Sequence, residues 1–61
     1  METKTLGNKI KEGRKKKKLT QEGLGQLLGK KKATVCNWEK DRFYPKGTDL
    51  VKLCRMFNIK L

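Results

Sequence analysis

The apolar residues of this chain recur every three or four positions within four separate stretches, which is the spacing of one face of an α-helix. The first stretch carries Leu6 and Ile10 and extends to about Lys17, where a cluster of lysines complements the helix macrodipole. No stretch alternates between apolar and polar residues as a half-buried strand does, and the sequence contains no internal repeat. The pattern therefore predicts an all-α domain.

The second predicted helix is short. Leu24, Leu27 and Leu28 form its apolar stripe, and Thr20 precedes it as an N-cap, whose side-chain oxygen accepts a hydrogen bond from the helix backbone. Gly29 follows the stripe, and glycine commonly ends a helix in the left-handed conformation. We expect a tight turn there that leads directly into a third helix.

The third predicted helix spans about residues 31–40 and buries Val35 and Trp38, which are three positions apart. A loop at residues 41–47 contains the single proline, and a fourth helix is predicted for about residues 48–57. The inner face of this fourth helix comprises Leu50, Leu53, Cys54 and Phe57. Two short helices joined by a tight turn are typical of a unit that presents its second helix to a DNA groove.

The two ends of the chain differ in composition. Residues 1–5 are polar and are predicted to form a flexible N-terminal arm. Thr5 is placed to cap the first helix, and Asn58 is placed to end the fourth. We expect Ile59 and Leu61 to fold back on the core.

The chain is strongly basic. Seventeen lysine and arginine residues stand against six acidic residues, which gives a formal net charge of +11. We interpret this charge as a nucleic-acid partner rather than as a surface that merely aids solubility. The chain has no apolar run long enough to span a membrane and no signal-peptide core, so we expect a cytoplasmic, nucleoid-associated protein.

Metal and catalytic chemistry have few candidate residues. Cys36 and Cys54 are the only cysteines and histidine is absent, so a tetrahedral zinc site lacks ligands. One disulfide is possible, but the cysteine density is below that of small secreted scaffolds, and we interpret both residues as reduced thiols. Serine is also absent and the six carboxylates are scattered. We therefore predict no enzyme activity, no cofactor and no metal.

Several short motifs occur in the order and at the spacing of one family of DNA-binding domains. They are Leu19-Thr20-Gln21, Leu24, Leu28-Gly29, Thr34-Val35, Trp38-Glu39, Tyr44-Pro45 and the helix from Leu50 to Ile59. Through them the chain resembles the Cro/phage-repressor helix-turn-helix family, also called the xenobiotic-response-element family, over residues 6–61. The resemblance implies one DNA-binding domain there, a small four-to-five-helix bundle of the lambda-repressor-like type with a central helix-turn-helix. The chain ends where the fifth helix would start.

The resemblance also implies that the helix at residues 31–40 enters the major groove of double-stranded DNA. The candidate base contacts are Lys31, Lys32, Ala33, Thr34 and Asn37. Gln21 matches a residue that contacts a phosphate and braces the recognition helix. The remaining candidate phosphate contacts are Thr20, Lys40, Arg42, Tyr44 and Lys46.

The chemistry of these residue types suits base recognition. The Asn37 amide can pair with N6 and N7 of adenine, and Lys32 can donate to O6 and N7 of guanine. Ala33 and the Thr34 methyl group can touch a thymine methyl group. For Thr34 the alternative is that its hydroxyl bonds the preceding helical turn.

Arg14 and Glu39 match a family ion pair that joins the first helix to the end of the third, and we expect this pair to be structural. The sequence departs from the family pattern elsewhere. Gly25 replaces an alanine, Lys30 replaces an apolar residue just after the turn, and Asp41 stands where glycine is typical. The last departure leaves the geometry of that helix end open.

The sequence thus predicts a transcriptional regulator, in particular a repressor of phage or mobile-element type that binds a palindromic operator, with a homodimer on the DNA as one option. Two alternatives remain. An antitoxin-like protein with another protein as its main partner would expose an apolar patch, for which Leu27, Phe43 and Leu61 are candidates. A basic RNA- or ribosome-associated protein would instead expose aromatic side chains on which bases stack.

Overall fold

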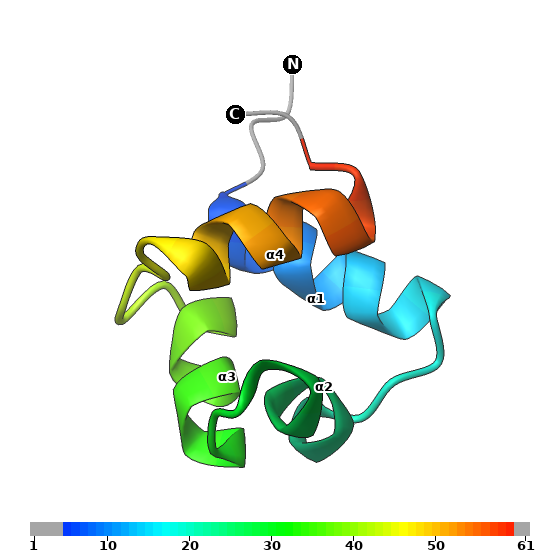
Figure 1. Cartoon of the computed structure of the whole chain (residues 1–61), viewed down its shortest axis with the longest axis horizontal. Helices are drawn as coiled ribbons and strands as arrows, with labels where there is room; N and C mark the ends of the chain where they lie inside the picture. Colours follow the sequence, from blue (N-terminus) through cyan, green and yellow to red (C-terminus); the bar gives the residue numbers. More distant parts are fainter. Residues whose placement is uncertain (1–4, 60–61) are drawn as a thin grey trace.

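The computed structural model describes residues 5–59, and within them the chain forms four α-helices and no strand (Figure 1). The helices are α1 (Leu6–Lys16), α2 (Gln21–Leu28), α3 (Lys32–Glu39) and α4 (Thr48–Phe57). The all-α prediction is confirmed, and each predicted helix is present within about one residue of its expected ends. The predicted flexible arm at residues 1–5 lies outside the described residues apart from Thr5, and Leu61 also lies outside them.

The packing of the helices agrees with the helix-turn-helix bundle that the sequence resemblance implies. α2 and α3 pack against each other as the helix-turn-helix pair, and α1 packs against both α3 and α4. Figure 1 shows α4 lying along α1 on one side of the molecule, with α2 and α3 on the other. The scaffold of α1 and α4 thus holds the helix-turn-helix and leaves one side of it open to solvent.

The core draws on every helix. Ile10, Leu24, Val35 and Leu53 are fully buried, one from each element, and burial of each such side chain stabilises the fold by about 1.5–3 kcal/mol. Leu28 and Trp38 complete the buried set, and the half-buried residues around it are Leu6, Leu19, Met56, Phe57 and Ile59. The burial of Val35 and Trp38 confirms the inner face predicted for the third helix.

Leu27 was predicted to belong to the apolar stripe of the second helix, and that prediction is wrong, because Leu27 is 60% exposed. The buried face of α2 is formed by Leu24, Gly25 and Leu28 instead. A Cβ atom on Gly25 would lie 2.6 Å from the carbonyl oxygen of Lys30, so the backbone after the turn rests directly on this glycine. That close approach turns the inner face of α2 toward α3 and leaves Leu27 on the outside.

The predicted helix ends are confirmed. The Thr5 and Thr20 hydroxyls accept hydrogen bonds from the backbone N–H groups of Asn8 and Gly23, at 3.2 and 2.9 Å. Gly29 ends α2 in the left-handed conformation, with φ of 70°. Asn58 does the same for α4 with φ of 53°, and the following residue, Ile59, packs against the core as expected.

Both cysteines are free thiols and half-buried, so the possible disulfide is not formed. Within residues 5–59 no group of three or more potential metal ligands comes together. None of the helices described for this chain is long and apolar enough to cross a membrane.

Candidate nucleic-acid interface

The outward face of α3 carries several of the predicted contact residues. Ala33, Asn37 and Lys40 lie at positions i, i+4 and i+7, which places them on one helix face, opposite the buried Val35. Ala33 and Lys40 are exposed, and Asn37 is half-buried. Thr34 lies nearer the core and is half-buried. Within residues 5–59 its hydroxyl makes no hydrogen bond, so the structure gives no support to the alternative in which it bonds the preceding helical turn.

The first turn of α3 is electropositive. Lys31 is the N-cap residue without a side-chain cap, Lys32 follows it, and the turn contains no acidic residue. Lysines there oppose the helix macrodipole, but an anion would be attracted by the lysines and by the free backbone N–H groups together. This differs from α2, whose first turn is capped by Thr20 and contains Glu22.

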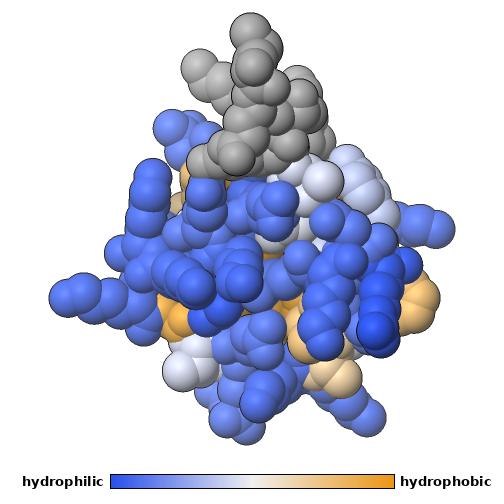
Figure 2. Space-filling model, turned by 180° about the vertical axis from the view of Figure 1, so that it is seen from behind, coloured by the Kyte–Doolittle hydropathy of each residue, from blue (hydrophilic) through white to orange (hydrophobic). Residues whose placement is uncertain are grey.

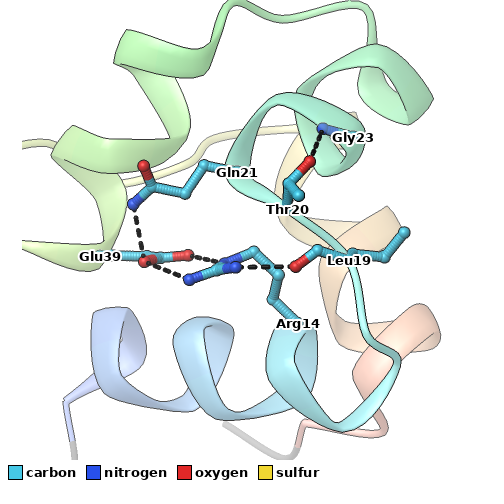
Figure 3. Close-up of polar contacts among 6 residues, drawn as sticks. All are labelled: Arg14, Leu19, Thr20, Gln21, Gly23 and Glu39. Atoms are coloured by element: carbon cyan, nitrogen blue, oxygen red, sulfur yellow. Dashed lines mark hydrogen bonds and ion pairs between the residues drawn. The ribbon is translucent and has the colours of Figure 1, made fainter.

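A buried polar network joins the C-terminal end of α3 to α1 and α2 (Figure 3). The Arg14 Nε atom lies 2.6 Å from Glu39 Oε2, and the two side chains are only 12% and 4% exposed. Arg14 also donates from Nη1 to the Leu19 carbonyl oxygen at 2.7 Å. The ion pair expected between Arg14 and Glu39 is therefore present.

Gln21 completes this network from the start of α2. Its Nε2 atom donates to Glu39 Oε1 at 3.0 Å, and its side chain points toward the end of α3 (Figure 3). Gln21 was predicted to contact a phosphate and to brace the recognition helix, and its geometry provides the brace. Its neighbour Thr20 is exposed beside it, with its hydroxyl already accepting from Gly23.

The loop after α3 supplies a row of exposed side chains. The four predicted phosphate contacts in this segment occupy alternate positions and all are exposed: Lys40, Arg42, Tyr44 and Lys46. The loop is anchored by the buried Pro45 and by the backbone N–H of Arg42, which donates to the Asn37 carbonyl at 3.0 Å. Cations therefore continue from the end of α3 along the loop toward α4.

Three polar contacts near this surface were not predicted from the sequence. Lys30 forms an ion pair with Asp49 in the first turn of α4, with Nζ and Oδ2 3.2 Å apart, so its charge is directed to the scaffold. Asp41 accepts hydrogen bonds from Thr5 and Gly7 at the start of α1. All three contacts join residues far apart in the chain, and the three-to-four-residue repeat of a helix cannot predict contacts between such residues.

Exposed apolar side chains are present as well. Among residues 5–59, the large exposed apolar side chains are those of Leu27, Phe43, Tyr44 and Val51. Seen from the side opposite Figure 1, the surface is mostly hydrophilic, and apolar side chains emerge only in separate small areas (Figure 2). On that face, a charged surface with separate apolar areas favours a polyanion over an apolar partner.

Comparison with known proteins agrees with this geometry. A family model described as helix-turn-helix matches residues 10–61. The chain is also similar to Repressor protein C2 of Salmonella phage P22, with 33% identity over 55 residues. The aligned part covers 90% of this chain but 26% of the phage protein, so the chain spans about a quarter of the length of that relative. No solved structure matches the chain significantly.

Proposed function

This chain belongs to the helix-turn-helix family of the Cro and phage-repressor type, and on that premise we propose that it binds double-stranded DNA sequence-specifically and represses transcription. In this proposal α3 enters the major groove, and the N-terminus of α2 and the loop at residues 40–46 contact the phosphates. The observation that carries the proposal is the two-sided character of α3. One face is locked into the core by Val35, Trp38 and Glu39, and the other presents Ala33 and Asn37 beside a lysine-rich first turn.

Repression follows from occlusion of a promoter, and the similarity to a phage protein named as a repressor supports it. We propose a palindromic operator bound by two copies, since symmetric half-sites are the usual partners of such domains. A protein of this kind would act at the nucleoid. Titration of a palindromic duplex and of its single half-site tests for the dimer. If two copies bind together, binding to the palindrome depends cooperatively on protein concentration, and binding to the half-site does not.

Sequence preference is expected to reside in Asn37 and Lys32. Replacement of either by alanine should weaken binding to the preferred duplex by about 1–3 kcal/mol, and should weaken binding to random duplex DNA less, because a base contact is lost only on the preferred site. The preferred site comes from selection out of a random DNA pool. Lys52→Ala removes an equivalent charge from the exposed side of α4 and is the control for Lys32→Ala. Equal losses on both kinds of DNA would contradict base reading.

Affinity is expected to fall steeply with salt. If each domain neutralises about four to six phosphates, the slope of log K against log salt should be about −4 to −5. Arg42→Ala should reduce the magnitude of this slope by about one unit and leave sequence preference almost unchanged. Arg55→Ala is the matched control, because Arg55 is an exposed arginine in the last turn of α4, an end of the helix that lies away from α3 (Figure 1).

A flat salt dependence would refute the electrostatic interface. Salt-dependent binding to single-stranded or hairpin RNA that exceeds binding to duplex DNA would instead favour the RNA-associated alternative.

A further inference from the structure

The turn after α3 is tied to the start of α1 by the side chain of Asp41. One carboxylate oxygen, Oδ2, accepts a hydrogen bond from the Thr5 hydroxyl at 2.8 Å. The other, Oδ1, accepts from the backbone N–H of Gly7 at 3.2 Å. The first turn of a helix has unpaired N–H groups and a positive dipole end, so an anionic acceptor there is favourable. Asp41 thus caps α1 from a distant part of the chain.

The backbone at Asp41 is in a conformation that glycine adopts most readily. Its φ is 61°, in the left-handed region. Its N–H donates to the Trp38 carbonyl at 3.1 Å, and the next N–H, that of Arg42, donates to the Asn37 carbonyl at 3.0 Å. This is the hydrogen-bond pattern in which a helix is ended by a left-handed residue, usually glycine.

Lys18 ends α1 in the same left-handed conformation, with φ of 57°, and can therefore be compared with Asp41. The N–H groups of Lys18 and Leu19 donate to the carbonyls of Lys15 and Arg14, each at 3.0 Å. The two turns are therefore alike in their backbone, but within residues 5–59 only the Asp41 side chain joins its turn to a second helix.

Asp41 also lies between two exposed cations of the proposed interface, Lys40 and Arg42. We infer that Asp41 is a positioning residue of the DNA interface, which holds the turn after α3 against α1 so that Lys40 and Arg42 are directed at the phosphates. This inference rests on the proposed function. Asp41 itself is an anion and would be repelled by phosphate, so its contribution acts through its neighbours.

Positioning and simple electrostatics predict opposite results when the charge is removed. Asp41→Asn adds one unit to the positive net charge, and charge alone would tighten binding to DNA. The asparagine amide, however, has one acceptor oxygen in place of two and no negative charge, so the favourable anionic contact with the start of α1 is weakened even where the amide donates to the Thr5 hydroxyl. Asparagine also tolerates the left-handed conformation, so the turn itself is preserved. Positioning therefore predicts weaker binding from a more positive protein.

The test measures binding of the whole chain to a random-sequence duplex and to the duplex selected by the wild type, across several salt concentrations. Asp41→Asn is expected to weaken binding about three- to tenfold and to reduce the salt slope by about one unit, the signature of one lost phosphate contact. Asp41→Gly, which relaxes the backbone and removes both bonds, should weaken binding at least as much. Circular dichroism establishes that each variant is folded at the temperature of the titration.

Two controls separate positioning from charge and from backbone strain. Glu22→Gln removes an exposed acid from the first turn of α2 and is expected to leave binding unchanged or slightly tighter. Lys18→Gly relaxes the equivalent turn after α1 and should not weaken binding by more than the loss of one lysine. In a background of Lys40→Ala with Arg42→Ala, Asp41→Asn should leave binding unchanged or slightly tighter, because the groups that it positions are gone and only its effect on net charge remains.

Equal or tighter binding by Asp41→Asn with an unchanged slope would overturn the inference and leave the proposed function standing. So would a loss that persists in the Lys40→Ala and Arg42→Ala background. Failure of the wild type to bind either duplex would overturn the proposed function, and the inference with it.

Discussion

Arg14→Ala is expected to destabilise the domain by about 3–5 kcal/mol, because it leaves a buried carboxylate without its counter-ion. The Glu39 side chain is only 4% exposed and lies 2.6 Å from Arg14. After the substitution the Glu39 carboxylate keeps the hydrogen bond from the uncharged amide of Gln21. Since a domain of this size is stable by only about 3–9 kcal/mol, a loss of this magnitude unfolds much of the population at moderate temperature.

Glu39→Ala is expected to cost less than Arg14→Ala. The Arg14 side chain is more exposed, at 12%, and its guanidinium keeps its hydrogen bond to the Leu19 carbonyl. The double variant should lose less than the sum of the two single losses, because neither unpaired charge remains in it. Glu39→Gln preserves the shape of the side chain and should rank between the wild type and Glu39→Ala.

Thermal unfolding followed by circular dichroism measures these differences. Each kcal/mol corresponds to about 4–8 °C in the midpoint for a domain of this size. Additive losses in the cycle, or a larger loss for Glu39→Ala than for Arg14→Ala, would contradict an ion pair held by the burial of Glu39.

Local sequence signals were sufficient for the helices and most of their ends. The three-to-four-residue spacing of apolar residues correctly predicted that Ile10, Val35 and Leu53 are buried, because residues with that spacing lie on the same face of a helix. Thr20 and Gly29 marked the ends of α2, since capping depends on residues adjacent in the chain. Spacing failed at Leu27, because the face that α2 turns inward is decided by the contact between Gly25 and Lys30.

The polar contacts of the candidate interface were harder to predict from sequence. The pairing of Arg14 with Glu39 was predicted from the family resemblance, because no local sequence pattern relates residues 25 positions apart. The hydrogen bond between Gly7 and Asp41 joins residues 34 positions apart, and no sequence motif predicted it. The unusual aspartate at a helix end was visible in the sequence, but its acceptor role depends on how α1 packs on α3. The base and phosphate contacts themselves remain predictions.

Gly7 of α1 lies directly against the end of α3, where there is no room for a side chain. A Cβ atom at Gly7 would overlap the Trp38 carbonyl oxygen and would lie 2.9 Å from the Glu39 carbonyl oxygen and 2.6 Å from Asp41 Oδ1. Two of these three neighbours are backbone atoms, so a rotamer change cannot relieve the overlap. Either α1 shifts away from α3, or the Asp41 carboxylate moves and its tie to α1 weakens.

Gly7→Ala is therefore expected to destabilise the domain by about 2–3 kcal/mol, the cost of overpacking and of a weakened cap exceeding the gain of up to about 1 kcal/mol in helix propensity. Gly23→Ala is the matched control, the same substitution in a helix where the added methyl group meets only side-chain atoms. There a Cβ atom would lie 3.1 Å from the Thr20 hydroxyl and 3.8 Å from a Leu19 methyl carbon, so the hydroxyl must move by a few tenths of an ångström while it still accepts from the Gly23 N–H. Gly23→Ala is expected to be neutral or to stabilise by up to about 1 kcal/mol. Denaturant unfolding of the two variants compares them directly, and a Gly7→Ala variant as stable as Gly23→Ala would show that α1 does not require this close approach to α3.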